Sequence, residues 1–303
     1  MELHEIIAKS YAVGPAIKIE KTKYGSGNTY FVETNQEKYI AKTNERMDFV
    51  HIYDKVENLL NEMNILQSRI IKTNYGGIMT SEGVVLYEFI DGDSCTILTK
   101  SQSENAIRYI RKYNKALSLI PFKVEELDVK NHWDKARSID FIINEFSNYL
   151  IELEIEIQDK KHIYDVINML SKNRSRMTEQ SKQLIHSDLG ADNFIFKDDK
   201  IISIIDFTPE YNHEVYSLCQ FIYWNNLWNT SNINKDDINN YLKIYNFGDD
   251  INIEKDAFYL LLLNAALYRI VGPLIDKLNR NIKDYKGLEK RFFILRELLN
   301  LNQ

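Results

Sequence analysis

The chain has 303 residues, of which 44% are hydrophobic and 27% charged, so it can bury the core of one large or two medium domains. Only 11 glycines and 4 prolines occur, which excludes collagen-like and low-complexity chains and disfavours an all-β sandwich or propeller, because those folds need many turns. The formal net charge of −6 provides no basic surface for nucleic acid or for an anionic membrane.

The cysteines and the apolar segments bear on the cellular location. Cys95 and Cys219 make neither a disulfide framework nor a metal-ligand cluster, which favours a reducing, cytoplasmic environment. The first residues lack a basic segment followed by an apolar run, so no signal peptide is predicted. Residues 257–271 are the most apolar stretch, but Asn264 and Arg269 interrupt them and they fall short of the roughly 20 residues that span a bilayer. A buried helix is expected there, and no membrane partner.

Residues 1–91 are predicted to form a small antiparallel sheet with one main helix. Short β-branched and aromatic runs bounded by turn residues predict strands at 16–22, 29–33 and 38–42. Apolar residues spaced by three and four predict a helix over 53–70. Glycines then bracket a hairpin in which residues 78–79 are expected to pair with a strand at 84–90.

After Gly92 the pattern becomes mostly helical. Apolar spacing predicts helices around 107–120, 139–150, 163–170, 215–228, 258–275 and 288–299. The strands predicted in this part are 194–196 and 201–205, joined as a hairpin. The expected fold class is therefore α+β, with a sheet-rich part at 1–91 and a larger, mostly helical part at 92–303.

The densest group of polar residues runs from His186 to Asn193, and Asp206 follows it at the end of the predicted hairpin. Asp188, Asn193 and Asp206 could converge on one point. Such a set suits phosphoryl transfer, because one carboxylate can accept the proton of an attacking hydroxyl while an amide oxygen and a second carboxylate are hard ligands for Mg²⁺. The alternative is an Asp/Asn turn between two buried strands, with His186 satisfied in the core.

A kinase-type site also needs a loop over the nucleotide phosphates, a strand lysine and a helix glutamate that holds the lysine, in that order. The chain offers Gly25-Ser26-Gly27 between its first two strands, Lys42 at the end of the third and Glu62 in the next helix. Glu57 is an alternative to Glu62, since the sequence does not fix the register of this helix. Each feature alone is more often an ordinary turn, strand end or surface acid, but their joint order favours a nucleotide site.

In these motifs the sequence resembles the aminoglycoside phosphotransferase and choline kinase group of small-molecule kinases, which share a two-lobed protein-kinase-like fold. The resemblance extends over nearly the whole chain. It implies a nucleotide-binding lobe at 1–91 and a helical lobe with the catalytic loop and acceptor site at 92–303. It also implies ATP or GTP as co-substrate, Mg²⁺ as cofactor and a small-molecule alcohol or amine as acceptor, with no protein partner.

The resemblance implies a role for each site residue. Asp188 is the catalytic base, and Asn193 and Asp206 bind Mg²⁺. His186 is a structural member of the catalytic loop. The nucleotide is contacted by the phosphate loop, by Lys42 paired with Glu62, and by main-chain groups of a hinge; these residues are Gly25, Ser26, Gly27, Lys42, Glu62, Glu88, Phe89 and Ile90.

Two departures from protein kinases bear on the substrate. Thr208 stands where protein kinases have the glycine of Asp-Phe-Gly, and Pro209 fixes its own φ near about −65°, so a flip of this loop is not expected. No Ala-Pro-Glu segment or long activation loop follows, so a protein substrate is disfavoured.

The acceptor is less constrained. Several acids and aromatic residues after Asp206 fall in the segment that faces the acceptor in similar kinases; they are Glu210, Tyr211, Glu214, Tyr223, Trp224 and Trp228. Aromatic residues at helical spacing more often pack in the core, but they can also stack on a substrate or hold a cation. An amine-bearing antibiotic such as an aminoglycoside is the first expectation. A metabolic alcohol (choline, ethanolamine, homoserine or methylthioribose) is the alternative, and a nucleotide-binding pseudokinase or scaffold is the alternative of another class.

Overall fold

The computed structural model describes residues 2–22, 28–178, 181–248, 252–280 and 287–301. They fold as two compact units, and the chain passes from one to the other several times. The first unit comprises Met1–Ile97, Lys112–Leu127 and Ala191–Glu210, and the second comprises Leu98–Arg111, Asp128–Gly190 and Tyr211–Gln303. The sequence predicts a single boundary at residue 92. In the structure, the later segments Lys112–Leu127 and Ala191–Glu210 also belong to the first unit.

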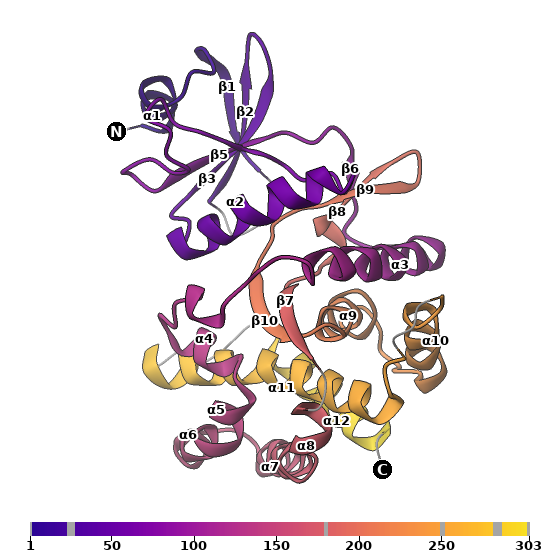
Figure 1. The fold of residues 1–303 in the computed structure, drawn as a ribbon. Helices are drawn as coiled ribbons and strands as arrows, with labels where there is room; N and C mark the ends of the chain where they lie inside the picture. The colour runs from indigo at the N-terminus through magenta and orange to yellow at the C-terminus, as the bar shows by residue number, and fades with distance from the viewer. Residues whose placement is uncertain (1, 23–27, 179–180, 249–251, 281–286, 302–303) are drawn as a thin grey trace. The chain divides into compact units, whose positions relative to one another are not determined.

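The first unit is built on a five-stranded antiparallel sheet with the order β1-β2-β3-β5-β4 (Figure 1). Its strands are β1 (Ala16–Lys21), β2 (Thr29–Thr34), β3 (Lys38–Thr43), β4 (Ile70–Ile71) and β5 (Val84–Glu88). The predicted strands at 16–22, 29–33 and 38–42 are confirmed, each to within one residue at either end. Lys42 lies opposite Val85 near the end of β3.

One helix packs on each face of this sheet, because successive residues of a strand point to opposite faces. On one face Leu86 packs in a core cluster with Ile7 of α1 (Leu3–Ser10). On the other, the preceding residue Val85 packs with Val50 of α2 (Met47–Glu62). The end of β3 and helix α2 therefore belong to the same unit.

Two predicted elements of this unit were wrong. The helix predicted over 53–70 is α2, which begins at Met47 and ends at Glu62, and Asn64 just beyond it adopts the left-handed φ of 59° that terminates helices. Residues 70–71 form β4, and this strand, rather than residues 78–79, pairs with β5. The apolar spacing continues across the end of the helix into a strand, so periodicity alone misplaced the boundary.

A smaller sheet completes the first unit. Its order is β6-β8-β9, with β6 (Asp93–Ser94), β8 (Phe194–Lys197) and β9 (Lys200–Ile204). The predicted hairpin is confirmed, and Asp198 and Asp199 form its turn with φ of 50° and 59°. Asn193 ends the short helix η2 (Ala191–Asn193) before β8, and its carbonyl accepts the Ile205 N–H at 2.9 Å, so the hairpin brings Asn193 close to the residue before Asp206.

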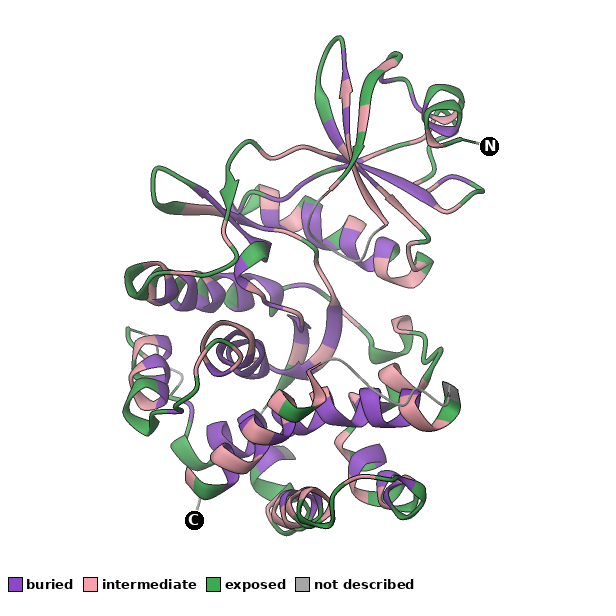
Figure 2. Cartoon of the chain, turned by 180° about the vertical axis from the view of Figure 1, so that it is seen from behind, coloured by how far each residue is buried: buried purple, intermediate pink, exposed green. Residues whose placement is uncertain are grey.

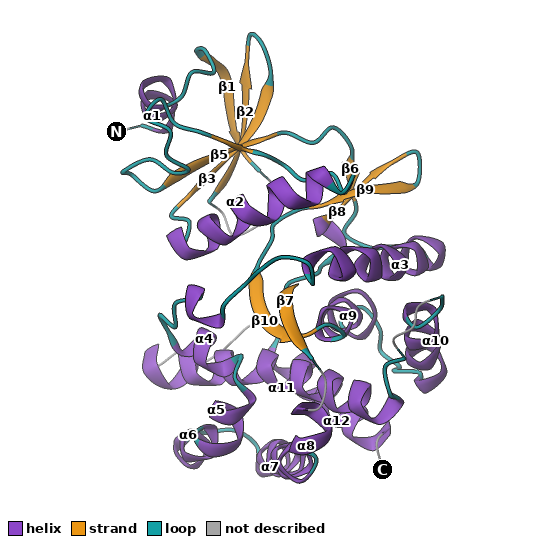
Figure 3. Ribbon diagram, viewed as in Figure 1, coloured by secondary structure: helices purple, strands orange, loops and turns teal. Residues whose placement is uncertain are grey.

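The second unit is mainly helical, as Figure 3 shows. Its helices are α4 (His132–Ala136), α5 (Ile139–Asn144), α6 (Phe146–Glu152), α7 (Ile157–Lys172), α8 (Arg174–Thr178), α9 (Tyr216–Ile222), the π-helical η3 (Tyr223–Leu227), α10 (Lys235–Tyr245), α11 (Lys255–Arg280) and α12 (Leu288–Leu301). Helix α3 (Lys100–Leu117) contributes to both units, and η1 (Val124–Glu126) belongs to the first. The strands β7 (Lys182–His186) and β10 (Pro209–His213) pair in a two-stranded sheet that was not predicted, because β10 lacks an apolar alternation.

Helix α11 forms the core of the second unit. It packs against α4, α7, α9 and α12, and its residues are buried along most of its length (Figure 2). Lys255–Asn279 is long and apolar enough to cross a membrane, with a mean hydropathy of 1.7, but 94% of its apolar 18-residue window is buried inside the protein. The predicted buried helix at 257–271 is thus confirmed as the core helix of this unit.

Candidate active site

A pocket of about 320 Å³ lies in the first unit, bordered by β3, α2, the segment after β5 and the ends of the β8–β9 hairpin. Its walls are largely apolar, with Ile40, Val50, Tyr87, Ile195 and Phe207 among them. Its charged and amide side chains include Lys42, Glu45, Glu88, Asn193 and Asp206. An apolar pocket with a few convergent polar groups is the usual form of a small-molecule site.

Lys42 and Asp206 form an ion pair at this pocket. The Lys42 side chain is only 18% exposed, and the carboxylate of Glu45, from the loop between β3 and α2, adds to the negative field around it. Burial by itself would lower the pKa of the ammonium, but Asp206 and Glu45 outweigh burial and raise it. Lys42 is therefore a fixed positive charge at neutral pH.

The structure pairs Lys42 with a residue other than the predicted Glu62. Glu62 is the last residue of α2 and its side chain is exposed, while the Lys42 ammonium contacts Asp206 instead. The alternative, Glu57, is buried, but its carboxylate accepts a hydrogen bond from Asn61 Nδ2 at 3.2 Å. Neither glutamate forms an ion pair with Lys42 among the described residues, so the pairing stays a prediction.

The segment after β5 borders the pocket, as expected for a hinge. The N–H of Glu88 donates to the Arg69 carbonyl at 2.8 Å, and that of Phe89 donates to the Lys38 carbonyl at 3.2 Å, so both serve the sheet. The N–H of Ile90 has no hydrogen-bond partner among the described residues, although Ile90 lines the pocket. The predicted phosphate loop, Gly25-Ser26-Gly27, lies outside the described residues.

Gly92 ends this segment where it meets β8. A Cβ atom at this position would lie 2.5 Å from Cγ2 of Ile195 and 2.7 Å from the carbonyl oxygen of Phe196. A backbone oxygen cannot rotate away as the end of a side chain can, so the close approach requires glycine. Gly92 thereby fixes one wall of the pocket.

Asn193 and Asp206 are the candidate metal ligands, and both line the pocket. Asp206 has a φ of 59°, in the left-handed region that costs a non-glycine residue roughly 1 kcal/mol or more. Asp198 and Asp199, which share this conformation, form a hairpin turn, whereas Asp206 faces a pocket. Backbone strain at a pocket carboxylate indicates a functional constraint.

The donor set at the pocket fits Mg²⁺. No group of three His, Cys, Asp or Glu that could hold a metal alone occurs within the part of the chain that the structure describes. Mg²⁺ does not require such a group, because it is usually held by one or two carboxylates together with substrate phosphates and water. One carboxylate and one amide oxygen, from Asp206 and Asn193, therefore suit a cation that arrives with a nucleotide.

The predicted catalytic loop follows β7 in the second unit. His186 is fully buried, and its Nδ1 accepts the backbone N–H of Asp188 at 3.3 Å. The Asp188 side chain is half exposed, and its Oδ1 accepts hydrogen bonds from Arg269 Nη2 at 2.8 Å and from Trp224 Nε1 at 3.2 Å. Desolvation raises the pKa of Asp188, but the Arg269 guanidinium outweighs it and the net shift is downward. The carboxylate is therefore ionised at neutral pH.

Residues 19–209 match the model of the phosphotransferase enzyme family. The chain belongs to this family. The match includes Lys42, Asp188, Asn193 and Asp206 and ends before most of the segment expected to face the acceptor. The chain is therefore a small-molecule phosphotransferase, but its family does not name the acceptor. None of the curated protein sequences matches it.

The fold of this phosphotransferase is shared by solved small-molecule kinases. Choline kinase LicA from Streptococcus pneumoniae is similar with a TM-score of 0.66 and 13% identity, over 99% of this chain and 98% of that one. A thermostable mutant of the aminoglycoside phosphotransferase APH(4)-Ia, in a ternary complex with ADP and hygromycin B, gives 0.66 and 11% over 99% and 98%. The amicoumacin kinase hAmiN, in complex with AMP-PNP, Ca²⁺ and Ami, gives 0.65 and 15% over 98% and 92%. These likenesses confirm the predicted α+β, protein-kinase-like fold.

The two acids expected in the acceptor-facing segment, Glu210 and Glu214, are largely buried in the phosphotransferase. Glu210 is only 4% exposed. Glu214 forms a buried ion pair with Arg111, and its Oε1 also accepts the hydroxyl of Tyr245 at 2.7 Å. The burial and pairing of these two carboxylates argue against the predicted contact with a cationic acceptor, because both would have to be uncovered first.

The expected aromatic wall is also partly used by the protein itself. Tyr223 is fully buried, so it supports its neighbours rather than facing a ligand. Trp224 and Trp228 are half-buried, with ring centroids 5.4 Å apart. The guanidinium of Arg269 lies 4.7 Å from the ring centre of Trp224, and that of Arg291 lies 5.4 Å from that of Trp228. Tyr211, on β10, is half-buried.

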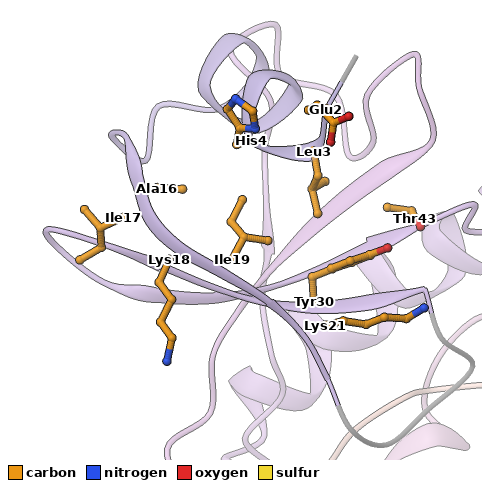
Figure 4. A pocket seen from close by; sticks show the side chains of 10 residues that line it. All are labelled: Glu2, Leu3, His4, Ala16, Ile17, Lys18, Ile19, Lys21, Tyr30 and Thr43. Carbon is orange, nitrogen blue, oxygen red and sulfur yellow. The ribbon is translucent and has the colours of Figure 1, made fainter.

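A second hollow of about 540 Å³ lies in the first unit beside α1, β1 and β2. Figure 4 shows Lys18 and Ile17 directed outward and Tyr30 and Lys21 along its floor. Its lining residue from β3 is Thr43, and none of the predicted site residues lines it. We assign no role to it in the phosphotransferase reaction.

Sequence reasoning missed three contacts of the site residues. Glu45 was missed because it lies in a loop rather than on the helix where a lysine partner was sought. Arg269 was noted only as an interruption of an apolar helix, although an arginine within a buried helix needs an anion partner and so signals one. The pairing of Arg111 with Glu214 joins residues 103 positions apart, beyond the reach of local spacing.

Proposed function

We propose that the protein transfers the γ-phosphoryl group of ATP to a hydroxyl of a small molecule. The observation that carries the proposal is the Lys42–Asp206 pair at the apolar pocket, within the region that matches the phosphotransferase family. A protonated lysine binds phosphate oxygens as a point charge. The apolar walls would take the purine ring, and the N–H of Ile90 is the donor that we assign to it. ATP and GTP both fit this description.

Asp206 and Asn193 would hold Mg²⁺. The cation, when bound, neutralises charge on the β- and γ-phosphates. Asp206 pairs with Lys42 in this structure, so its carboxylate already lies beside the charge that we assign to the phosphates. Mg²⁺ is the cofactor of choice because both ligands are oxygen donors.

Asp188 would receive the acceptor hydroxyl. Its carboxylate is half exposed and ionised at neutral pH, so it can accept a hydrogen bond from the hydroxyl and then its proton. With a lowered pKa it is a weak base, so its larger contribution is to orient the nucleophile.

The acceptor that we place first is an amine-bearing antibiotic such as an aminoglycoside, whose phosphorylation would give resistance. APH(4)-Ia was solved with hygromycin B and hAmiN is an amicoumacin kinase, which supports this class. A metabolic alcohol is the second candidate, supported by the likeness to the choline kinase LicA. We expect the enzyme to act in the cytoplasm, where ATP is present.

A ligand screen tests the nucleotide half of the proposal. MgATP or MgGTP at saturating concentration is expected to raise the melting temperature. The same measurement is then made with a panel of aminoglycosides, other amine antibiotics and metabolic alcohols. Transfer of ³²P from labelled ATP identifies the acceptor. If no nucleoside triphosphate raises the melting temperature, the kinase function is refuted and a scaffold role is favoured instead.

Replacement of Asp188 tests the chemical half. Asp188→Ala is expected to lower kcat at least roughly a hundredfold while MgATP binding is retained, because the side chain acts on the acceptor and not on the nucleotide. Turnover near that of the wild type would remove Asp188 from the mechanism. Titration calorimetry with MgATP on both proteins serves as the folding control.

A further inference from the structure

The carboxylate proposed as catalytic base is held by two donors at the same oxygen. Arg269 Nη2 donates to Asp188 Oδ1 at 2.8 Å, and Trp224 Nε1 donates to it at 3.2 Å. The two donors come from different elements, Arg269 from α11 and Trp224 from the π-helical η3. Two donors on one oxygen fix the plane of a carboxylate as well as its position.

Arg269 is itself fixed. Its Nε and Nη2 donate to Gln220 Oε1 of α9 at 3.0 and 2.6 Å. Its guanidinium lies 4.7 Å from the ring centre of Trp224 and 5.3 Å from that of Tyr268, and the side chain is only 12% exposed. A planar guanidinium between aromatic rings has few orientations available, so it presents Nη2 to Asp188 in one geometry.

Among the described residues, charged and titratable groups act on Asp188, on Arg269 or on the residue next to Asp188. They are His186 at the end of β7, Arg137 between α4 and α5, Tyr216 on α9, Tyr268 and Arg269 on α11, and Arg291 on α12. Arg137 Nη1 donates to the neighbouring Ser187 Oγ at 2.8 Å, and Arg291 Nη1 donates to the Arg269 carbonyl at 2.6 Å. Of these groups, Arg269 forms an ion pair with the Asp188 carboxylate, with Nη2 2.8 Å from Oδ1.

We propose that Arg269 is a positioning residue of the phosphotransferase, which orients the Asp188 carboxylate toward the acceptor hydroxyl through their ion pair. This inference rests on the proposed function of Asp188. A side chain with only a structural role would change stability, whereas a positioning residue also sets the rate of the transfer step and its dependence on pH. A misplacement of a catalytic group by about 1 Å costs about a hundredfold in rate.

The test compares the wild type with Arg269→Gln, Arg269→Lys and Arg174→Gln. In Arg269→Gln we expect kcat to fall by about ten- to a hundredfold, with the dissociation constant of MgATP changed less than about twofold. In Arg269→Lys, which keeps the charge but loses the planar fork, we expect an intermediate kcat. Arg174 is the matched control, because it pairs with Asp140 at 2.6 Å but both side chains are about half exposed.

The pH profile separates positioning from structure. The Arg269 guanidinium holds the pKa of Asp188 down, so without it desolvation is expected to raise that pKa. The carboxylate is active only above its pKa, so the acid limb of kcat/KM moves to higher pH in Arg269→Gln. A reduced kcat with an unmoved acid limb, or a wild-type kcat, would overturn the inference.

A second readout needs no acceptor. Trp224 donates to the same oxygen, so its fluorescence should report the protonation of Asp188 in a pH titration. Asp188→Asn is the control, because it cannot undergo this protonation. The midpoint is expected to rise in Arg269→Gln, and an unchanged midpoint refutes the inference. If the wild type transfers no phosphate to any acceptor, the proposed function fails while this titration still decides the role of Arg269.

A milder variant covers the case in which Arg269→Gln does not fold. Gln220→Ala leaves the Arg269–Asp188 charge pair but removes the acceptor that holds the guanidinium. We expect a severalfold lower kcat with an unmoved acid limb. A kcat equal to that of the wild type would show that the orientation of Arg269 is irrelevant and would refute the inference.

Discussion

The ion pair between Glu214 and Arg111 gives the most decisive prediction, because sequence and structure assign Glu214 different roles. The sequence suggests a contact with the acceptor, whereas in the structure the carboxylate binds Arg111 and the Tyr245 hydroxyl. The change is Glu214→Gln, which keeps the shape of the side chain and removes its charge. Arg111 would then be a buried cation that has lost its ion pair with Glu214.

The magnitude follows from burial. The side chains of Arg111 and Glu214 are only 9% and 13% exposed, so solvent screens the pair little. Breaking a buried ion pair on one side costs about 3–5 kcal/mol, and the retained shape of glutamine places this change near about 3 kcal/mol. At roughly 2–4 °C per kcal/mol for a chain of this size class, the melting temperature should fall by about 6 °C or more.

The assay is urea unfolding followed by circular dichroism, with thermal unfolding as a second measure. Glu104→Gln is the control on the same helix as Arg111, since Glu104 lies 3.7 Å from the half-exposed Arg108 and its loss should cost less than about 0.5 kcal/mol. Arg111→Met together with Glu214→Leu should recover most of the stability, because an apolar pair leaves no buried charge. Unchanged stability of Glu214→Gln with a raised KM for the acceptor would refute this reasoning and restore the acceptor role.

The remaining predictions concern the pocket of the first unit. Asp206→Asn should lower kcat by at least about a hundredfold and weaken the Mg²⁺ dependence of ATP binding, which calorimetry at varied Mg²⁺ measures; an unaltered Mg²⁺ dependence would exclude Asp206 as a ligand. Gly92→Ala should destabilise the protein by about 1–3 kcal/mol and weaken MgATP binding, because its Cβ would overlap the Phe196 carbonyl at 2.7 Å. Gly77→Ala, whose nearest contact is Thr73 Oγ1 at 3.2 Å, is the control, and equal effects of the two changes would argue against a tight wall at Gly92.

Much of the fold could be predicted because its signals are local. The strands around Lys42 alternate and are bounded by turns, and the hairpin before Asp206 has two aspartates at its tip. The end of α2 could not be predicted in this way, because Ile70 continues the helical spacing although it lies in β4. Tertiary pairing with β5, rather than periodicity, decides the conformation of that residue.

The site divides along the same line. The sequence predicts the strands and the hairpin that position Lys42, Asn193 and Asp206. It was therefore possible to expect these three residues at one pocket. Whether Glu62 can reach Lys42 depends on where α2 ends, which the apolar spacing does not determine. Arg269 belongs to α11, 81 residues after Asp188, and only the packing of α11 on the rest of the second unit makes the contact. A contact of that kind has no periodic signature in the sequence.

Each of the two proposed reactive carboxylates is paired with a cation of its own unit, and the two cations differ in kind. Asp206 is paired with a lysine, whose ammonium is a point charge on a flexible stem, and Asp188 is paired with an arginine held against two aromatic rings. A metal ligand must exchange partners whenever the metal and nucleotide come and go, which the Lys42 pair permits. A group that orients a hydroxyl must keep its geometry in every cycle, which the Arg269 pair enforces. The choice of lysine for one carboxylate and arginine for the other is therefore what the two proposed roles require.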